Sequence, residues 1–373
     1  MIFDVPELED LGNVSGKSVL VRVDFNVPLD EGGQITDDFR IRSALPTLRW
    51  LVDQGASVTA CSHLGRPKGE VNPKFSLEPV RSHLASFLPE VSLLENLRFN
   101  PGEVANDPGF VDELVAGHDF FVNDAFGASH RSHASVVGVP SRVPSAAGRL
   151  LANEVGVLLG VRKDPRRPLV AVMGGAKVSD KLGVIEALLD HVDSLVIGGG
   201  MAYTFQKSLG HSIGNSLCED DMVETTSRLL KGEKPIHLPV DGVAIAPGGK
   251  LCDTDDGSEV RIVGVDVPDE WASVDIGPET AAVFSEIIAD AGTVLWNGPM
   301  GVFEDTRFSA GTETVAHAIA ETDAFTIVGG GDSAAAAKKF GVDNQVDHVS
   351  TGGGASLELI EKGDLPGLAA LRS

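Results

Sequence analysis

A chain of 373 residues is too long for one ordinary hydrophobic core, so its length predicts two domains. An apolar content of 42%, 43 glycines and few aromatic residues favour an α/β fold over an all-β sandwich. The net charge of −24 argues against nucleic acid or an anionic membrane as a partner. Such an acidic composition is frequent in proteins from high-salt cells, and it also occurs in ordinary mesophiles.

Three scattered cysteines, Cys61, Cys218 and Cys252, give no disulfide framework and indicate a reducing compartment. The first ten residues lack the basic and apolar regions of a signal peptide. No apolar run approaches the roughly 18 residues of a membrane span. We therefore expect a soluble, cytoplasmic protein. We also expect a monomer, although no feature of the sequence bears on the oligomeric state.

Short β-branched runs recur along the chain, with segments of helical periodicity between many of them. This alternation is typical of parallel βαβ units, and continuously apolar strands indicate sheets covered by helices on both faces. The predicted strands are 19–23, 57–61, 91–94, 120–122, 169–172, 195–197, 242–245, 294–296 and 325–328. The predicted helices include 42–54, 182–191, 281–291 and 310–322.

The fold class expected from this pattern is α/β, with two doubly wound, Rossmann-like parallel-sheet domains joined by a helix and a hinge. Prolines at 140 and 144 mark the likeliest boundary, and a helical stretch follows them. The expected division is a first domain at 1–145, a connecting helix at 146–161, a second domain at 162–355 and a returning segment at 356–373. Whether the tail from 364 docks on the first domain is left open by the sequence.

In the first half, polar residues follow the apolar runs where strands end. Ligands of open α/β sheets bind outside the carboxyl ends of the strands, so these side chains are expected to meet at one sheet edge. Any single arginine could be an ordinary surface residue, but four at strand ends favour a site for a small, highly anionic molecule, because guanidinium groups match phosphate and carboxylate geometry. The candidates are Asp24, Asn26, Arg40, His63, Arg66, Arg98 and Arg131.

In the second half, glycines follow the strands, as at Gly174-Gly175 and Gly198–Gly200. Lys177 and Lys181 lie four residues apart, so we expect both ammonium groups on one helix face near the helix N-terminus. Lysines normally avoid that positive end, and an anion between them would explain the placement; a solvent-exposed basic face is the alternative. Glycines let backbone N–H groups approach phosphate oxygens, so the pattern predicts a nucleotide site, although the Walker A pattern is absent.

Residues 329–334 match G-x-G-x-x-A after a strand, which alone is a weak dinucleotide signal. Asp332 would repel phosphates unless a cation lies between them, so we expect Mg²⁺ there. Asp332 or Ser333 could instead simply cap the next helix. In the segment 296–304, Asn297 is a candidate for phosphate and Glu304 for ribose hydroxyls, with a plain turn as the alternative.

Together these segments resemble the phosphoglycerate kinase family over essentially the whole chain. Nine motifs occur in the family's order, which makes the resemblance very specific. They are RVDFNVP from Arg22, SHLGRP from Ser62, LENLRF from Leu94, NDAFGASHR from Asn123, GGAKVSDK from Gly174, GGGM from Gly198, WNGPMGVFE from Trp296, GGGDS from Gly329 and STGGGAS from Ser350.

The resemblance implies reversible transfer of the acyl phosphate of 1,3-bisphosphoglycerate to Mg-ADP, giving 3-phosphoglycerate and Mg-ATP. It assigns the seven candidates of the first half to the glycerate substrate. It implies that Asp332 anchors Mg²⁺ and that Lys177 follows the transferring group. The nucleotide residues that it implies are Gly175, Lys177, Lys181, Gly199, Asn297, Glu304, Gly331, Asp332 and Ser333.

As a mechanism, we expect Arg40 and Lys177 to neutralise the transferring group from opposite domains, in line and after domain closure. No general base is needed, because the acceptor oxygen is already anionic. Two other classes of protein compete with this interpretation. A binding protein that clamps an anion would leave Lys177, Lys181 and Asp332 unexplained, and an NAD(P)-dependent enzyme would not place Asp332 in the phosphate turn.

Overall fold

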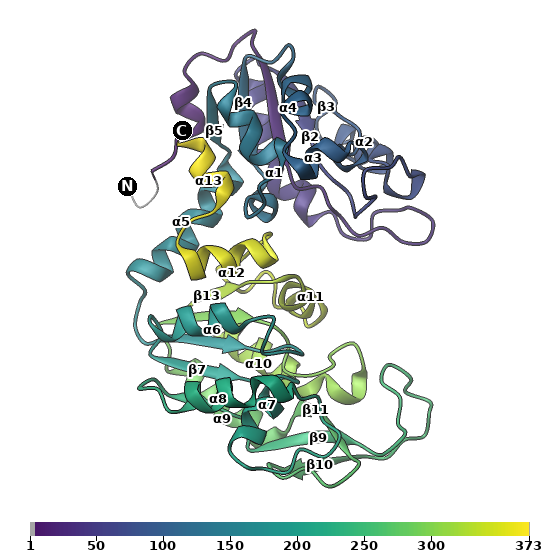
Figure 1. The fold of residues 1–373 in the computed structure, drawn as a ribbon, viewed down its shortest axis with the longest axis vertical. Coiled ribbons are helices and arrows are strands. Elements are labelled where there is room, and N and C mark those ends of the chain that lie inside the picture. Colours follow the sequence, from purple (N-terminus) through teal and green to yellow (C-terminus); the bar gives the residue numbers. More distant parts are fainter. Residues whose placement is uncertain (1–3, 373) are drawn as a thin grey trace. The chain divides into compact units, whose positions relative to one another are not determined.

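The computed structural model describes residues 4–372, which divide into two compact units (Figure 1). Unit 1 comprises Met1–Leu159 together with Gly354–Ser373, and unit 2 comprises Gly160–Gly353. The first division falls inside the segment 146–161 that was expected to connect two domains.

Unit 1 is built on one parallel sheet in the order β3-β2-β1-β4-β5. The chain order reverses between the neighbouring strands β1 and β4, which makes this edge a topological switch point. The strands are β1 Ser18–Val23, β2 Ser57–Cys61, β3 Ser92–Leu93, β4 Phe120–Asp124 and β5 Ser145–Ala147.

Helices cover this sheet through apolar stripes. In α1, Ile41, Leu45 and Leu48 are buried in the main core of the unit, at the spacing of one helix face. The helices that lie wholly or mostly in unit 1 are α1 Phe39–Asp53, α2 Glu78–Ala85, α3 Pro101–Ala105, α4 Pro108–Val115, α5 Arg149–Lys163, α12 Gly353–Lys362 and α13 Pro366–Leu371. Helix α5 continues past the division at Leu159 into unit 2. Short 3-10 or π turns are η1 Leu8–Leu11, η2 Pro73–Phe75, η3 Leu97–Phe99, η4 Phe126–Ala128, η5 Ala134–Gly138 and η6 Val139–Ser141.

The start of the helix expected at 146–161 was wrong. Residues from Ser145 pair with β4 as strand β5, and helix α5 begins only at Arg149. The reason is long-range capping: Asp124 Oδ1 accepts from the backbone N–H of Leu150 and Leu151, at 2.9 and 3.2 Å. A helix begins where its first N–H groups find acceptors, and this acceptor lies on another strand.

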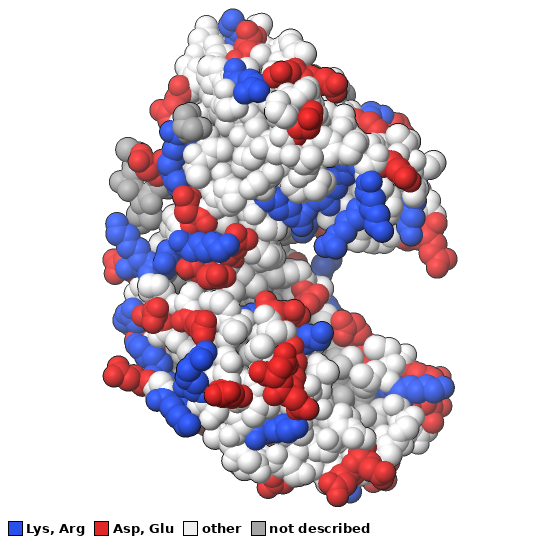
Figure 2. Space-filling model, in the orientation of Figure 1, with Lys and Arg blue, Asp and Glu red and all other residues white. Residues whose placement is uncertain are grey.

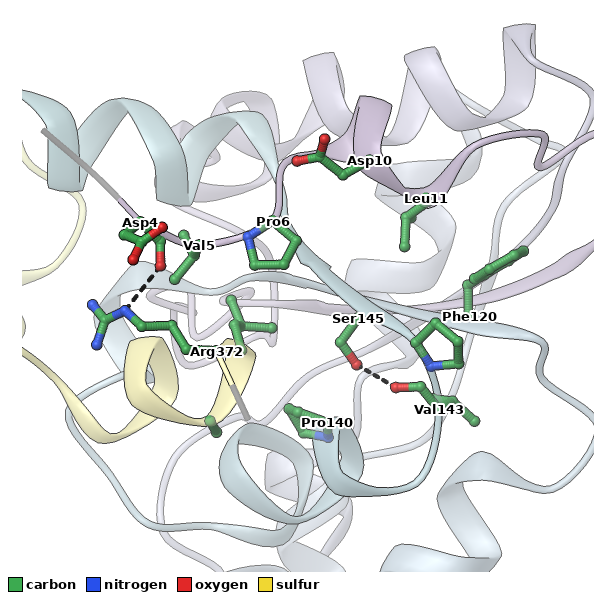
Figure 3. A pocket seen from close by; sticks show the side chains of 13 residues that line it. Asp4, Val5, Pro6, Asp10, Leu11, Phe120, Pro140, Val143, Ser145 and Arg372 are labelled. Atoms are coloured by element: carbon green, nitrogen blue, oxygen red, sulfur yellow. Dashed lines mark hydrogen bonds between the residues drawn. The ribbon is translucent and has the colours of Figure 1, made fainter. Parts of the chain in front are cut away.

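The C-terminal segment belongs to unit 1. Gly367 N donates to Ser129 O at 2.8 Å, and Arg372 Nε donates to Asp4 O at 3.0 Å, a bond visible in Figure 3. Helix α13 packs on η5, with Leu368 and Leu371 buried.

Unit 2 has a six-stranded parallel sheet in the order β14-β13-β12-β6-β7-β8. Its chain order reverses between β12 and β6, so this sheet also has a switch point at its centre. The strands of this sheet are β6 Leu169–Met173, β7 Ser194–Ile197, β8 Ile236–His237, β12 Thr293–Asn297, β13 Phe325–Val328 and β14 His348–Val349.

The strand predicted at 242–245 is not part of this parallel sheet. It is β9 Asp241–Ile245, which lies antiparallel between β10 Val260–Gly264 and β11 Ala272–Ile276 in a small separate sheet. The turn between β9 and β10 is held by Arg307, which donates to Asp256 Oδ1 at 3.0 Å and to Lys250 O at 2.7 Å. A run of apolar residues predicts a strand but not the direction of its neighbours.

Helices also cover the large sheet of unit 2, and their apolar residues form its main core with those of the strands. They are α6 Leu182–Leu189, α7 Ala202–Ser208, α8 Val223–Leu230, α9 Pro278–Ala289, α10 Ala310–Glu321 and α11 Gly331–Lys339, with turns η7 Asp220–Met222 and η8 Thr306–Phe308. Among residues 4–372, none of the helices combines the length and apolar character needed to cross a bilayer.

Candidate active site

The seven candidates of unit 1 come from the carboxyl ends of its central strands and the turns behind them. Asp24 follows β1, His63 follows β2, and Arg131 follows β4 and η4, so all three lie at the switch-point edge. Arg40 stands in the first turn of α1, and Arg98 lies within η3.

Asp24 and Arg40 form an ion pair at this edge. Arg40 Nη1 lies 3.3 Å from Asp24 Oδ2 and donates to Asn26 O at 3.1 Å. Asn26 Oδ1 in turn accepts from Gly65 N at 2.8 Å, which ties the turn after β1 to the turn after β2. Burial opposes ionisation of the Asp24 carboxyl, but the positive charges of Arg40 and Arg22 and the backbone N–H of Asn26 hold its pKa below the usual range.

The remaining arginines line a hollow of about 520 Å³. Arg66, Arg98 and Arg131 share its wall with Lys68 and His133, and Figure 2 shows Lys and Arg side chains gathered on one part of unit 1. Burial lowers the pKa of Arg98 to about 10, and the neighbouring Arg131 and Arg22 act in the same direction. The buried Nε of Arg98 has no hydrogen-bond partner within the described residues. Clustered guanidinium groups with an unsatisfied donor suit an anionic ligand.

Sequence reasoning missed three members of this cluster. Arg22 lies inside β1 and is fully buried, and its signal was a lone charged residue in the apolar run 19–23. Lys68 and His133 line the same hollow as the arginines, but no strand-end pattern marked them. His133 follows Arg131 by two residues, so the turn after η4 supplies both.

The strand-end loops of unit 2 are bound to one another through their backbones. Gly174 N donates to Asn297 O at 2.9 Å, and Gly175 N donates to Pro299 O at 3.0 Å. A Cβ added at Gly174 would lie 2.1 Å from Pro299 O, so this glycine is needed for the close approach of the two loops. The expectation that these two N–H groups are free for phosphate oxygens does not fit, because both already donate to carbonyls.

The placement of Lys177 and Lys181 on one helix face was also wrong. Lys177 is exposed in the loop after β6, and Lys181 precedes Leu182, the first residue of α6. Lys181 Nζ donates to Gly174 O at 2.7 Å and to Asn297 Oδ1 at 2.6 Å. Burial lowers the pKa of Lys181 to about 8, against the attraction of Asp332 and Asp180. The turn 178–181, closed by Lys181 N donating to Val178 O at 3.0 Å, separates the two side chains.

Asn297 and Ser333 are buried between the loops. The Asn297 Nδ2 group donates to Gly329 O at 2.6 Å, and Ser333 Oγ accepts from Gly298 N at 2.5 Å. Gly199 N donates to Met300 O at 3.1 Å with a positive φ of 68°. These three residues therefore join the ends of strands β7, β12 and β13.

Asp332, Gly331 and Glu304 are exposed, the first two in the opening turn of α11. No group of three or more metal-ligating side chains occurs between residues 4 and 372. A single exposed carboxylate fits an Mg²⁺ ion held mainly by nucleotide phosphates, because Mg²⁺ in such sites uses one or two carboxylates together with substrate oxygens. The donor set does not fit an ion held by protein ligands alone.

A second hollow of unit 1, about 680 Å³ in volume, lies where the C-terminal helix meets the N-terminal segment (Figure 3). Asp4, Asp10 and Arg372 lie on its wall among apolar residues such as Phe120 and Leu11. It contains none of the predicted site residues, so we assign it no part in the chemistry.

Comparison with known proteins decides the family. The model of the family "Phosphoglycerate kinase" matches residues 8–92 and 89–363. The chain belongs to the phosphoglycerate kinase family. It is 49% identical to the phosphoglycerate kinase of Rubrobacter xylanophilus over 99% of this chain and 98% of that protein. It is 52% identical to that of Salinispora tropica over 98% and 99% of the two chains.

Solved structures of phosphoglycerate kinases have the same fold as this chain. The enzyme from Coxiella burnetii is 39% identical with a TM-score of 0.88, and the enzyme from Pyrococcus horikoshii is 31% identical with a TM-score of 0.84. Each comparison covers 98% of both chains. The predicted family, its kinase activity and the two-domain, Rossmann-like α/β class are thereby confirmed. The protein is an enzyme that transfers a phosphoryl group between 1,3-bisphosphoglycerate and ADP.

Proposed function

We propose that unit 1 holds the glycerate substrate and unit 2 holds Mg-ADP or Mg-ATP for this transfer. The observation that carries the proposal is the cluster of arginines at the switch-point edge of unit 1, in which the buried Nε of Arg98 has no partner among residues 4–372. Such a cluster suits a ligand that carries both a carboxyl and a phosphate group.

In the glycerate half, Arg40 is the proposed catalytic arginine. The Asp24 carboxylate and the carbonyl of Asn26 orient its guanidinium, and because both accept from Nη1, the other N–H groups are proposed to serve the transferring group. We propose that the phosphate that is not transferred is bound by Arg66, Arg98 and Arg131, because these three side chains line one hollow. His63 is proposed as a neutral donor to the substrate.

In the nucleotide half, Lys177 is the proposed cation for the transferring group, since it is exposed in the loop after β6. Lys181, Asn297, Gly175, Gly199 and Ser333 are proposed to shape the phosphate-binding loops, because their described contacts join those loops. Glu304 is proposed to contact ribose. Gly331 and Asp332 begin α11, where backbone N–H groups favour an anion.

Mg²⁺ is proposed to bind the nucleotide phosphates with Asp332 as its protein ligand, and when bound it neutralises phosphate charge during transfer. The residues themselves contribute position and charge. The acceptor oxygen is anionic in either direction, so no side chain has to remove a proton. Direct transfer requires the two ligands to meet, so the proposal includes a closed state in which water is excluded.

The test is a coupled assay with 3-phosphoglycerate and Mg-ATP at low and at molar KCl. We expect turnover with 3-phosphoglycerate and none with glycerate that lacks the phosphate, because the arginine hollow would lose its main ligand group. A nucleotide thermal-shift panel separates the competing classes. Stabilisation by NAD(P) but not by Mg-ADP, or by neither nucleotide, would contradict the proposal.

A further inference from the structure

Arg22 is a fully buried arginine in the central strand β1, and it contacts His63, one of the proposed substrate residues. Its guanidinium makes three hydrogen bonds, to Ser135 Oγ at 2.8 Å, to Val23 O, and to His63 Nδ1 at 3.1 Å. The side chain therefore reaches from the interior of the sheet to the histidine at the end of β2.

The bond to His63 has only one possible direction. A guanidinium carries donors and no acceptor and stays charged in proteins, so Arg22 must donate and Nδ1 must accept. A nitrogen that accepts carries no proton. His63 bound in this way is neutral, and its proton lies on Nε2.

The opposite arrangement would need Asp24 as the partner of a protonated Nδ1. Asp24 Oδ1 lies 3.9 Å from Nδ1, beyond hydrogen-bond range, whereas Arg22 Nη2 lies within it. The charged groups facing His63 are Asp24 after β1, Arg22 in β1, Arg98 in η3 and Arg131 after η4. Burial, followed by the three arginines, lowers the pKa of His63 well below its usual value, although Asp24 opposes them.

A second buried charge holds Arg22 in place. Glu103 of α3 is fully buried and accepts from Ser135 N at 3.0 Å and from Ser135 Oγ at 2.7 Å. The Ser135 hydroxyl donates to Glu103 and accepts from Arg22, so it can serve both at once. Glu103, Ser135 and Arg22 thus form a buried relay from α3 through η5 to the histidine, which we call the Arg22 relay.

We propose that Arg22 is a positioning residue that fixes His63 as a neutral imidazole with its proton on Nε2, and that Glu103 holds Arg22 there through Ser135. The histidine then offers the substrate a hydrogen-bond donor of constant charge over the pH range of metabolism. The consequence for substrate binding rests on the proposed function, whereas the protonation state of His63 does not.

The first test is ¹⁵N NMR of the histidine-labelled protein between about pH 5 and pH 8, spanning the ordinary histidine pKa. The His63 signals are assigned by their loss in His63→Gln. We expect Nδ1 to give a pyridine-type signal and Nε2 a pyrrole-type signal, with no titration across the range. A proton on Nδ1, or titration of His63 near the ordinary histidine pKa, would overturn the proposal. This result needs only the wild-type protein and no variant of Arg22.

The second test removes the relay without leaving a lone buried charge. Arg22→Met with Glu103→Gln removes both buried charges, which Ser135 links, and removing both destabilises the fold less than removing one. We expect His63 to titrate within the range in this double variant. We expect it to stay neutral in Glu103→Gln, which keeps Arg22 and supplies an amide oxygen that can still accept from Ser135 Oγ. A histidine that remains neutral with its proton on Nε2 in the double variant would show that Arg22 does not set its state. If the double variant does not fold, the wild-type spectra still show whether His63 is neutral with its proton on Nε2, which supports or overturns the proposal.

The third readout separates this inference from the proposed function. The ratio of KM for 3-phosphoglycerate at the two ends of the pH range is compared between the wild type and the double variant, which cancels titration of the substrate. We expect that ratio to change by about fivefold, the size of about 1 kcal/mol for one charge-assisted hydrogen bond. An unchanged ratio together with a newly titrating His63 would contradict the role of His63 in substrate binding while upholding the role of Arg22.

Discussion

At the scale of single residues, buried polar groups of this protein orient more exposed side chains through hydrogen bonds. Arg40 is half-buried, and Asp24 and the carbonyl of Asn26 both accept from one of its nitrogens. We propose that its other N–H groups donate to the ligand. On the same helix, Arg42 is exposed and pairs with Asp38 at 2.8 Å, a surface contact with no link to the cluster. Two arginines of one helix are therefore expected to differ sharply in function.

Arg40→Ala is expected to lower kcat by on the order of 10²-fold or more, the usual cost of one preorganised charge at a transferring group. Steady-state kinetics with 3-phosphoglycerate and Mg-ATP measure it, and circular dichroism checks the fold. The matched control is Arg42→Ala, for which we expect kcat within about twofold, because exposed ion pairs contribute little. Equal losses in both variants would refute the catalytic assignment of Arg40.

Asp332→Ala is expected to weaken Mg-ADP binding by about tenfold or more, which corresponds to about 1.4 kcal/mol, while 3-phosphoglycerate binding is unchanged. Its exposed carboxylate is the proposed protein ligand of the ion. Isothermal titration calorimetry measures both ligands. Asp269→Ala, an exposed aspartate in the same unit, serves as the control. Unaltered Mg-ADP affinity in Asp332→Ala would exclude this residue as the anchor.

At the scale of elements, buried aspartates connect helix N-termini to distant strands. Asp124 at the end of β4 accepts from the first N–H groups of α5, and Asp275 in β11 accepts from Gly311 N at the start of α10, at 2.8 Å. Small residues make room for these carboxyls, since a Cβ at Gly148 would lie 2.2 Å from Asp124 Oδ1. Helix position in both units thus depends on a strand that is remote in sequence.

Gly148→Ala is expected to lower the free energy of unfolding by about 1–2 kcal/mol, the size of a lost helix cap, because the new methyl group displaces Asp124. Gly156→Ala lies in the same helix with nothing within 4 Å of its Cβ. For that control variant we expect the free energy of unfolding to rise by about 0.5–1 kcal/mol, because alanine has a higher helix propensity than glycine. Urea denaturation measures the free energy of unfolding of both variants. An unchanged value for Gly148→Ala would argue against capping of α5 by Asp124.

Asp275 predicts a pH dependence of stability. Burial raises the pKa of its carboxyl to about 7, against a reference value of 3.8. Between these values the folded protein holds a proton that the unfolded chain has released, so the free energy of unfolding falls as pH rises through this window. Each pH unit is worth about 1.4 kcal/mol for such a group.

Asp275→Asn is expected to flatten this slope, although losing one acceptor lowers stability at every pH. Urea unfolding monitored through the buried Trp296 of unit 2, at several pH values within the window, gives the slope. Asp253→Asn, at an exposed position of the same unit, is the reference variant. Parallel wild-type and Asp275→Asn curves would mean that the carboxyl is ionised throughout.

At the scale of the whole molecule, the net charge of −24 sets the response to salt. Like charges spread over a folded surface repel one another, and the unfolded chain separates them. Screening extends to about 10 Å at 0.1 M salt and shortens to about 3 Å at 1 M. Salt is therefore expected to favour the folded state of this protein.

The thermal midpoint is expected to rise between about 0.1 M and 1 M KCl at neutral pH, as repulsion is screened. Differential scanning calorimetry follows the transition of the enzyme. The control repeats the series near about pH 5, where part of the carboxylates are protonated and the effect of salt should be smaller. A midpoint that falls with KCl at neutral pH, or that rises equally at both pH values, would rule out charge repulsion as the cause.

The sequence by itself determined the class of fold, most strand positions and the residue types of both half-sites. These follow from local pattern: apolar runs make buried strands, and the polar or glycine residues after them lie at the sheet edge. The motifs also sufficed to predict the family, which the comparisons confirmed. The roles of the individual site residues stay predictions.

Only the tertiary structure decided what depends on partners remote in the chain. It put Lys181 against the carbonyls of two loops, started α5 at an aspartate of β4 and turned β9 antiparallel. It also joined Arg22 to His63 and, through Ser135, to Glu103. The physical reason is that a polar group left without a hydrogen-bond partner on burial destabilises the fold, and its partner can lie anywhere in the sequence. Local sequence patterns indicate which polar groups will be buried, and tertiary packing determines which hydrogen-bond partners those groups have.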